Sequence, residues 1–84
     1  MTAAAKLYDQ LLANPNRIIS FRDFMRLLEA FGFVHKRTKG SHRSYRHPKV
    51  PSILTIQPIG KDAAPYQVDR FLEFVREFDL HMAE

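Results

Sequence analysis

Apolar side chains recur along this chain at helical spacing in three stretches, and at the shorter spacing of a strand between the second and the third. The first stretch starts at Thr2 or Ala3 and ends at Ala13, where alanines favour helix and leucines recur on one side. The Asn-Pro-Asn segment that follows ends this helix. We therefore expect residues 1–17 to form an additional N-terminal helix and a linker that precede a smaller core.

The second helical stretch has a well-marked start. Ser20 is suited to be the N-cap, and Asp23 stands where a capping box places its acidic partner. Ile19 before the cap and Phe24 after it form the apolar pair that often accompanies such a start. Gly32 supplies the left-handed residue that ends the helix. The buried face expected from the spacing consists of Phe21, Phe24, Met25, Leu28 and Phe31.

After this glycine the pattern indicates strands. The three strands expected are residues 33–38, 41–47 and 53–57. Lys39-Gly40 is suited to a tight turn between the first two strands, which are then antiparallel. Residues 48–51 hold two prolines and interrupt the chain before the third strand, which Pro58 and Gly60 end.

The last helix is expected to begin near Pro65, because proline fits the first helical turn. Its core-facing stripe consists of Val68, Phe71, Leu72, Val75 and Phe78. Phe74 lies off this stripe and is available to pack on the N-terminal helix or on a partner. We therefore predict one α+β domain over residues 1–84, with the order α, α, β, β, β, α and helices on one face of a three-stranded antiparallel sheet.

Composition excludes several classes of protein. An apolar share of 45% with seven Phe residues supports a folded core, and 84 residues leave room for one domain only. Without cysteine, neither a disulfide framework nor a thiolate zinc site can form. No apolar run is long enough to span a membrane, and no signal-peptide core follows Met1. We therefore expect a soluble intracellular protein.

Positive charge is concentrated in one part of the chain. The net charge is +4, but the segment between Glu29 and Asp62 carries seven cations and no acidic side chain, which leaves −3 for the remainder. These cations are Lys36, Arg37, Lys39, Arg43, Arg46, Lys49 and Lys61. Such segregation favours a polyanionic ligand over a basic face that serves only solubility.

The four histidines are the side chains suited to exchange protons near neutral pH. In a regular strand His42 and His47 would point to opposite faces, and no carboxylate lies near them in the sequence. A metal site is therefore not expected. His35 and His47 are interpreted as surface residues of strands, and His81 as a surface residue of the C-terminal tail.

His42 differs from the others because it follows a Gly-Ser turn and is flanked by cations. An imidazole in that setting can take or give a proton during RNA cleavage while Lys and Arg hold the phosphate, with no metal required. The other interpretation is an exposed turn histidine with no chemical role. Tyr45 is also open to two interpretations, a ring on which RNA bases stack or a ring half-buried against the helices.

The same residues resemble a known family, the HicA toxins, which are small mRNA interferases of type II toxin–antitoxin modules. The similarity consists of Phe31-Gly32-Phe33-Val34 at the end of a helix, then Lys36-Arg37-Thr38-Lys39-Gly40-Ser41-His42, then Tyr45-Arg46-His47-Pro48. It covers the chain between Ser20 and Leu80, so residues 18–80 are interpreted as a HicA-like core. Residues 59–67 differ, because they lack the Lys-rich approach and Gly-Thr-Leu helix start of many members.

This resemblance implies a fold similar to a double-stranded-RNA-binding domain, and mRNA cleavage without metal or other cofactor in a bacterial or archaeal cytoplasm. His42 would be the catalytic residue. The RNA-binding residues would be Lys36, Arg37, Lys39, Gly40, Ser41, Arg43 and Arg46. A HicB-like antitoxin would cover the site.

Two other functions fit the same residues. A non-catalytic RNA-binding module with this fold would bind RNA in a salt-dependent manner and leave it intact. A protein-interaction subunit would use its basic face for an acidic partner and would not distinguish RNA from DNA.

Overall fold

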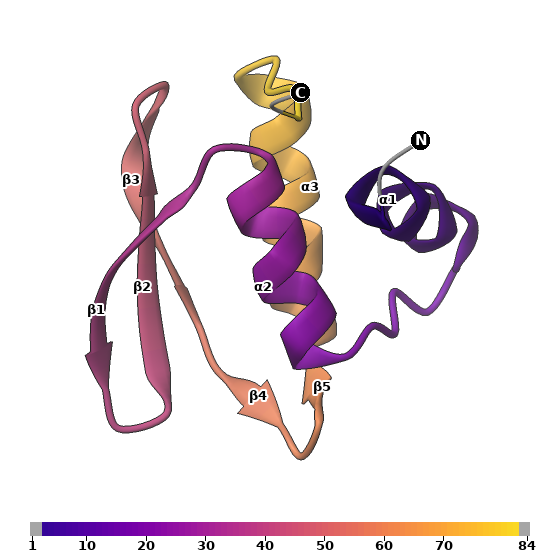
Figure 1. Cartoon of the computed structure of the whole chain (residues 1–84), viewed down its shortest axis with the longest axis horizontal. Coiled ribbons are helices and arrows are strands. Elements are labelled where there is room, and N and C mark those ends of the chain that lie inside the picture. The colour runs from indigo at the N-terminus through magenta and orange to yellow at the C-terminus, as the bar shows by residue number, and fades with distance from the viewer. Residues whose placement is uncertain (1–2, 83–84) are drawn as a thin grey trace.

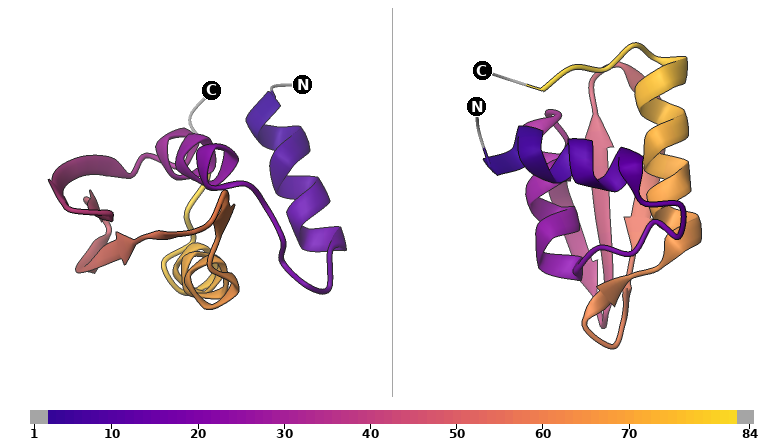
Figure 2. Two further views of the ribbon diagram at one scale, coloured as in Figure 1. Left: turned by 90° about the horizontal axis from the view of Figure 1, so that it is seen from below. Right: turned by 90° about the vertical axis from the view of Figure 1, so that its right-hand side faces the viewer.

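The computed structural model describes residues 3–82 of the chain. Its elements are, in order, α1 (Ala3–Ala13), α2 (Phe21–Ala30), β1 (Val34–Lys39), β2 (His42–His47), β3 (Val50–Ile56), β4 (Pro58–Ile59), β5 (Asp62–Ala63) and α3 (Pro65–Glu77). The antiparallel sheet has the order β1-β2-β3, and α2 and α3 lie side by side against one of its faces (Figure 1). α1 lies on the far side of these two helices from the sheet (Figure 2). The predicted α+β fold is therefore confirmed, while Thr2, one of the two predicted helix starts, lies outside the described residues.

The strand boundaries differ from the prediction at two points. The β1–β2 turn consists of Gly40 and Ser41, one residue later than expected. β3 begins at Val50 rather than at Ile53, so Pro51 lies inside the strand. A proline is tolerated there because β3 is at the edge of the sheet, where one side of the strand needs no hydrogen-bond donors.

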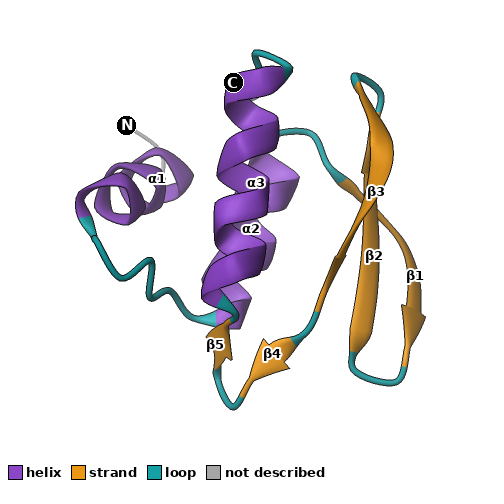
Figure 3. Ribbon diagram, turned by 180° about the vertical axis from the view of Figure 1, so that it is seen from behind, coloured by secondary structure: helices purple, strands orange, loops and turns teal. Residues whose placement is uncertain are grey.

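A second, two-stranded hairpin that the sequence did not predict follows the main sheet (Figure 3). β4 pairs with β5 across a turn in which Gly60 has a φ of +63°. The hairpin is attached to the start of α2, because the Phe21 N–H donates to the Lys61 carbonyl at 2.8 Å and the Ala63 N–H donates to the Ile19 carbonyl at 2.9 Å. Strands of two residues show no periodicity in a sequence, which explains why this element was missed.

α2 begins and ends as its sequence predicts. The Ser20 hydroxyl accepts a hydrogen bond from the Asp23 N–H at 3.1 Å, which satisfies one donor at the helix start. Gly32 has a φ of +92°, a conformation that favours glycine after a helix. The buried face differs at two positions, because Leu27, which was not predicted, is fully buried, whereas Met25 is half-buried.

α3 is covered on two sides, which corrects its predicted core stripe. The core side buries Val68, Phe71 and Phe74. Leu72 and Val75 are partly buried against the core and also line a groove of about 540 Å³ between α3 and α1, together with Tyr8 and Leu12. Phe74, predicted to lie off the stripe, is only 6% exposed. The predicted stripe is therefore confirmed for Val68 and Phe71, with its other members partly buried against the core, and its error is the omission of Phe74.

Aromatic rings connect the three helices in one core. The Phe71 ring centroid lies 5.8 Å from that of Phe24 and 5.2 Å from that of Phe31. Phe33, just before β1, lies 6.1 Å from Phe71. Tyr8 of α1 extends the cluster, with its ring 5.0 Å from that of Phe31. Phe71 of α3 therefore contacts aromatic rings from α2, from the end of α2 and from the segment that leads into the sheet.

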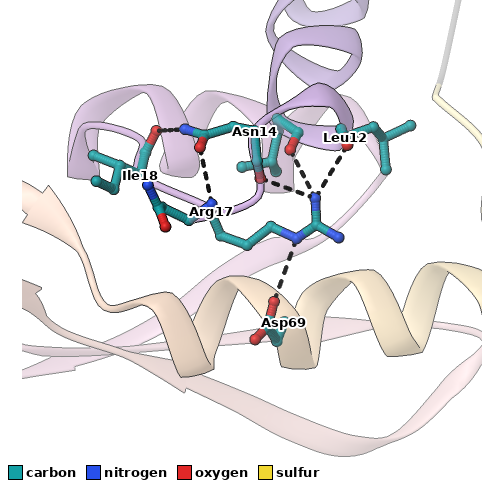
Figure 4. A network of polar contacts seen from close by, with 7 residues as sticks. Leu12, Asn14, Arg17, Ile18 and Asp69 are labelled. Atoms are coloured by element: carbon teal, nitrogen blue, oxygen red, sulfur yellow. Dashed lines mark hydrogen bonds and ion pairs between the residues drawn. The ribbon is translucent and has the colours of Figure 1, made fainter.

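Arg17 attaches the end of α1 to α3 (Figure 4). Its guanidinium donates to the carbonyls of Leu11, Leu12 and Asn14 at 3.0 to 3.2 Å, which satisfies acceptors left unpaired at a helix C-terminus. Its Nε lies 3.5 Å from the Asp69 carboxylate of α3. The carbonyl contacts contribute more than the ion pair, because the Asp69 side chain is 57% exposed to solvent.

Candidate functional site

The register of the main sheet places His42 on the face opposite α2 and α3, which we call the open face. His42 pairs with Lys39 across the turn, and Ser44 pairs with Arg37 on one side and Thr55 on the other. Paired residues of neighbouring strands share a face, and the Ser44 and Thr55 hydroxyl oxygens lie 3.4 Å apart. The open face therefore carries Arg37, Lys39, His42, Ser44, Arg46 and Thr55.

The charges of the open face are not neutralised by neighbouring side chains. β1, β2 and β3 contain no carboxylate. The ion pairs among residues 3–82 involve Arg17, Arg26 and His81, none of which lies in the main sheet. A row of unpaired cations along an exposed sheet favours an anionic ligand such as a nucleic-acid backbone.

The turn beside His42 is open to solvent. Gly40 has a φ of +61°, as hairpin turns with glycine at the first position require. No atom lies within 4 Å of the position that a Cβ on Gly40 would take. Both Ser41 and His42 are exposed, and the His42 side chain makes no hydrogen bond or ion pair within residues 3–82. A phosphate can therefore approach the turn and the imidazole without displacing other groups.

Tyr45 faces the helices and not the open face. It is 2% exposed, and its ring lies 5.3 Å from that of His35. Burial raises the pKa of the Tyr45 hydroxyl, and the negative charge of Glu29 raises it further. The interpretation of Tyr45 as a ring for stacking RNA bases is therefore wrong, and the alternative of burial against the helices holds.

Two of the predicted RNA-binding cations are placed differently from the rest. Arg43 pairs with the buried Ile56, so it lies on the helix side and can reach a ligand only around the end of the sheet. Lys36 lies at an irregularity in β1 between His35 and Arg37. With Arg46 it borders a groove of about 400 Å³ at the other end of the open face from the turn. The groove is lined by Val34, Lys36, Arg46, His47, Pro48, Val50 and Pro51.

His47 has a structural role that the sequence did not predict. Its Nδ1 accepts a hydrogen bond from the Lys49 N–H at 3.0 Å, so the ring proton is on Nε2, which donates to the Phe31 carbonyl at 2.9 Å. The ring also packs on Phe33 with centroids 5.1 Å apart. The interpretation of His47 as a surface strand residue is wrong, because the side chain is half-buried and connects β2 to the end of α2. His35 and His81 are exposed, as predicted.

Gly32→Ala is expected to destabilise the protein through this contact. An added Cβ would lie 3.1 Å from His47 Nε2, and the backbone φ of +92° is unfavourable for alanine. We expect a loss of about 2–3 kcal/mol in the free energy of unfolding, measured by urea denaturation. Gly60→Ala is the matched control, because its φ of +63° is also positive but nothing lies within 4 Å of the added atom. Equal losses for the two variants would contradict the role assigned to the His47 contact.

The structure gives two further findings that bear on function. Among residues 3–82, no three His, Asp or Glu side chains are grouped in a way that could hold a metal ion. None of the described helices is both long and apolar enough to cross a membrane.

Comparison with known proteins identifies one similarity. A family model described as HicA toxin of bacterial toxin-antitoxin matches residues 21–74. The match begins at the start of α2, so α1 lies outside it, and it includes the whole main sheet and most of α3. No curated protein and no solved structure shows significant similarity to the chain.

Proposed function

Because the chain belongs to the HicA toxin family, the toxins of toxin–antitoxin systems, we propose that it is an endoribonuclease that cleaves mRNA without a metal ion. The observation that carries this proposal is an exposed imidazole, His42, on an open sheet face whose cations have no carboxylate partners. We place the activity in residues 18–80, in the cytoplasm of the cell that makes the toxin.

In the proposed reaction, His42 takes the proton from a ribose 2′-hydroxyl. The 2′-oxygen attacks the adjacent phosphorus, and the bond from phosphorus to the 5′-oxygen of the next nucleotide breaks as that oxygen takes a proton from solvent water. The products are a 2′,3′-cyclic phosphate and a 5′-hydroxyl end. Lys39 pairs with His42 on the same face, and its ammonium stabilises the charge that develops on the phosphate oxygens.

The remaining cations are assigned to the RNA strand on either side of the scissile phosphate. Arg37 and Arg46 lie on the open face, whereas Lys36 borders the groove at its far end and Arg43 reaches the strand around the edge. Gly40 and Ser41 permit close approach of the backbone at the turn, since the space around them is free.

The family also implies an antitoxin partner, and we propose a HicB-like protein that covers the open face. Val34 and Ile53 are both 51% exposed and lie on strands of this sheet, which gives an antitoxin apolar surface to bury beside the cations. Bound antitoxin would exclude RNA from His42 and prevent cleavage.

The proposal is tested by incubating the purified protein with an mRNA transcript in excess EDTA. We expect fragments with 5′-hydroxyl ends, and no cleavage of DNA of the same sequence, because DNA lacks the 2′-hydroxyl. RNA that stays intact but is bound in a salt-dependent manner would favour the non-catalytic binding module instead. Equal binding of RNA and DNA without cleavage would favour the protein-interaction subunit.

A further inference from the structure

Within residues 3–82, Tyr66 has the largest exposed fraction among the exposed large apolar and aromatic residues, 66%. Yet its hydroxyl is held in place, because Gln67 Nε2 donates to it at 3.3 Å. Gln67 is the buried polar residue of the core, 7% exposed, and its Oε1 accepts a hydrogen bond from the Gln57 N–H at 3.0 Å. The tyrosine ring is therefore exposed while its orientation is fixed through a buried amide.

Gln57, whose N–H bonds to Gln67 beside Tyr66, lies at the same end of the main sheet as His42. Arg43 of β2 pairs with Ile56 of β3, so the antiparallel register places the next residue, Gln57, opposite His42. Gln67 bonds to the N–H of that same Gln57. The tips of the β1–β2 and β4–β5 hairpins also lie at the same end of the molecule (Figures 1 and 2). Tyr66 thus lies at the same end of the sheet as His42 but on the side that the helices cover, so an RNA strand bound at His42 reaches it around the end of the sheet.

The surroundings of Tyr66 suit one nucleotide of an RNA strand. The adjacent β4–β5 hairpin presents an exposed cation, Lys61, and an exposed apolar side chain, Ile59, which is 58% accessible. Asp62 is the acidic residue of this hairpin, and its backbone is fixed against Ser20 at the start of α2. An exposed aromatic ring at the start of α3 and an exposed cation on the hairpin that precedes it are the two kinds of group that bind single-stranded RNA, the ring for a base and the cation for a phosphate.

We propose that Tyr66 is a stacking platform for an unpaired base of the bound RNA, at the His42 end of the sheet, where the strand passes from the open face around the end of the sheet toward α3. The proposal rests on the proposed function and makes it more specific, because it names single-stranded RNA as the substrate class and a base as the group recognised. It also assigns the stacking role to α3 and not to the main sheet, whose Tyr45 is buried. Lys61 would hold the phosphate of the same nucleotide.

The test uses the full-length chain carrying His42→Ala, so that bound RNA is not consumed. Adding Tyr66→Ala is expected to weaken binding of a short single-stranded RNA by about 5- to 100-fold, the range for loss of one stacked base. Tyr66→Phe keeps the ring and is expected to bind within about twofold of the parent. An oligomer of the same length made of abasic ribose phosphates is expected to bind all three proteins equally.

Tryptophan fluorescence gives a second readout of RNA binding at position 66 that does not depend on a comparison of affinities between variants. The chain has no tryptophan, so Tyr66→Trp creates a single reporter, whose emission stacked bases are expected to quench. Leu12→Trp is the control, because Leu12 is 49% exposed but lies on α1 beside the groove with α3. Its emission is expected to stay unchanged when RNA binds.

The outcomes separate the two proposals. Tight RNA binding that Tyr66→Ala leaves unchanged, or equal quenching of both reporters, would overturn the stacking platform and leave the nuclease proposal standing. Absence of RNA binding and of cleavage by the unsubstituted protein would overturn the proposed function, and the stacking platform with it.

Discussion

Replacing His42 by alanine is expected to remove RNA cleavage while the protein stays folded. The imidazole is exposed, lies at the first position of β2 and makes no side-chain hydrogen bond within residues 3–82, so its loss costs little stability. Loss of a general base is expected to lower the cleavage rate by about 10²- to 10⁴-fold. Single-turnover cleavage of a defined RNA in EDTA measures this directly, and circular dichroism confirms the fold.

The matched control for this variant is His81→Ala. His81 is also exposed, and the ion pair that its side chain makes within residues 3–82 is with Asp79, at 3.3 Å, so its removal is expected to leave the cleavage rate unchanged. The same pair can be compared in cells, where growth arrest is expected with His81→Ala and not with His42→Ala. A His42→Ala protein that cuts RNA at the parent rate would show that the imidazole has no part in the reaction.

Replacing Phe71 by alanine is expected to have the largest effect on stability. Phe71 is fully buried, and its ring has neighbours on α2 and on the segment leading into β1. Loss of such a ring removes about 3–5 kcal/mol from the free energy of unfolding. A domain of this size has a total stability of only about 5–15 kcal/mol, so a large unfolded population is expected at 37 °C.

Two controls identify the cause of that loss. Phe71→Leu keeps most of the volume, so it is expected to cost clearly less than the alanine variant. Phe78→Ala removes a ring at the C-cap of α3, from a half-buried position, and is also expected to cost less. Urea denaturation gives all three values. If Phe71→Ala and Phe78→Ala were equally stable, the central position of Phe71 in the aromatic core would be contradicted.

The main elements could be predicted because local chemistry marks their ends. Ser20 with Asp23 starts α2, Gly32 ends it, and Pro65 starts α3 at the first helical position. These signals involve residues that are close in the sequence. The alternation of apolar and polar residues then distinguished strands from helices in the middle of the chain.

The features that were predicted wrongly depend on contacts between residues that are distant in the sequence. His47 was interpreted as a surface residue because its partner, the Phe31 carbonyl, lies 16 residues away on another element. Phe74 was excluded from the core stripe, but the core side of α3 buries it together with Val68 and Phe71. The same limit applies to the candidate site.

Within the candidate site, the sequence predicted the cluster of cations and His42 but not their division between two faces. That division depends on the register, which an irregularity between His35 and Arg37 shifts by one residue in β1. Tyr66 gave no signal at all, because an aromatic residue in the first turn of a helix is ordinary in a sequence. Only the contact from Gln67 to Gln57 places it at the His42 end of the sheet.

The most direct test is cleavage, in EDTA, of an RNA that carries a single 2′-deoxy nucleotide at a mapped cleavage position. If His42 activates the ribose hydroxyl, that one bond stays intact while the same bond in unmodified RNA is cut. Cleavage of the deoxy bond at the unmodified rate, or cleavage only after a divalent metal is restored, would contradict a mechanism in which this imidazole on a basic sheet face performs the reaction.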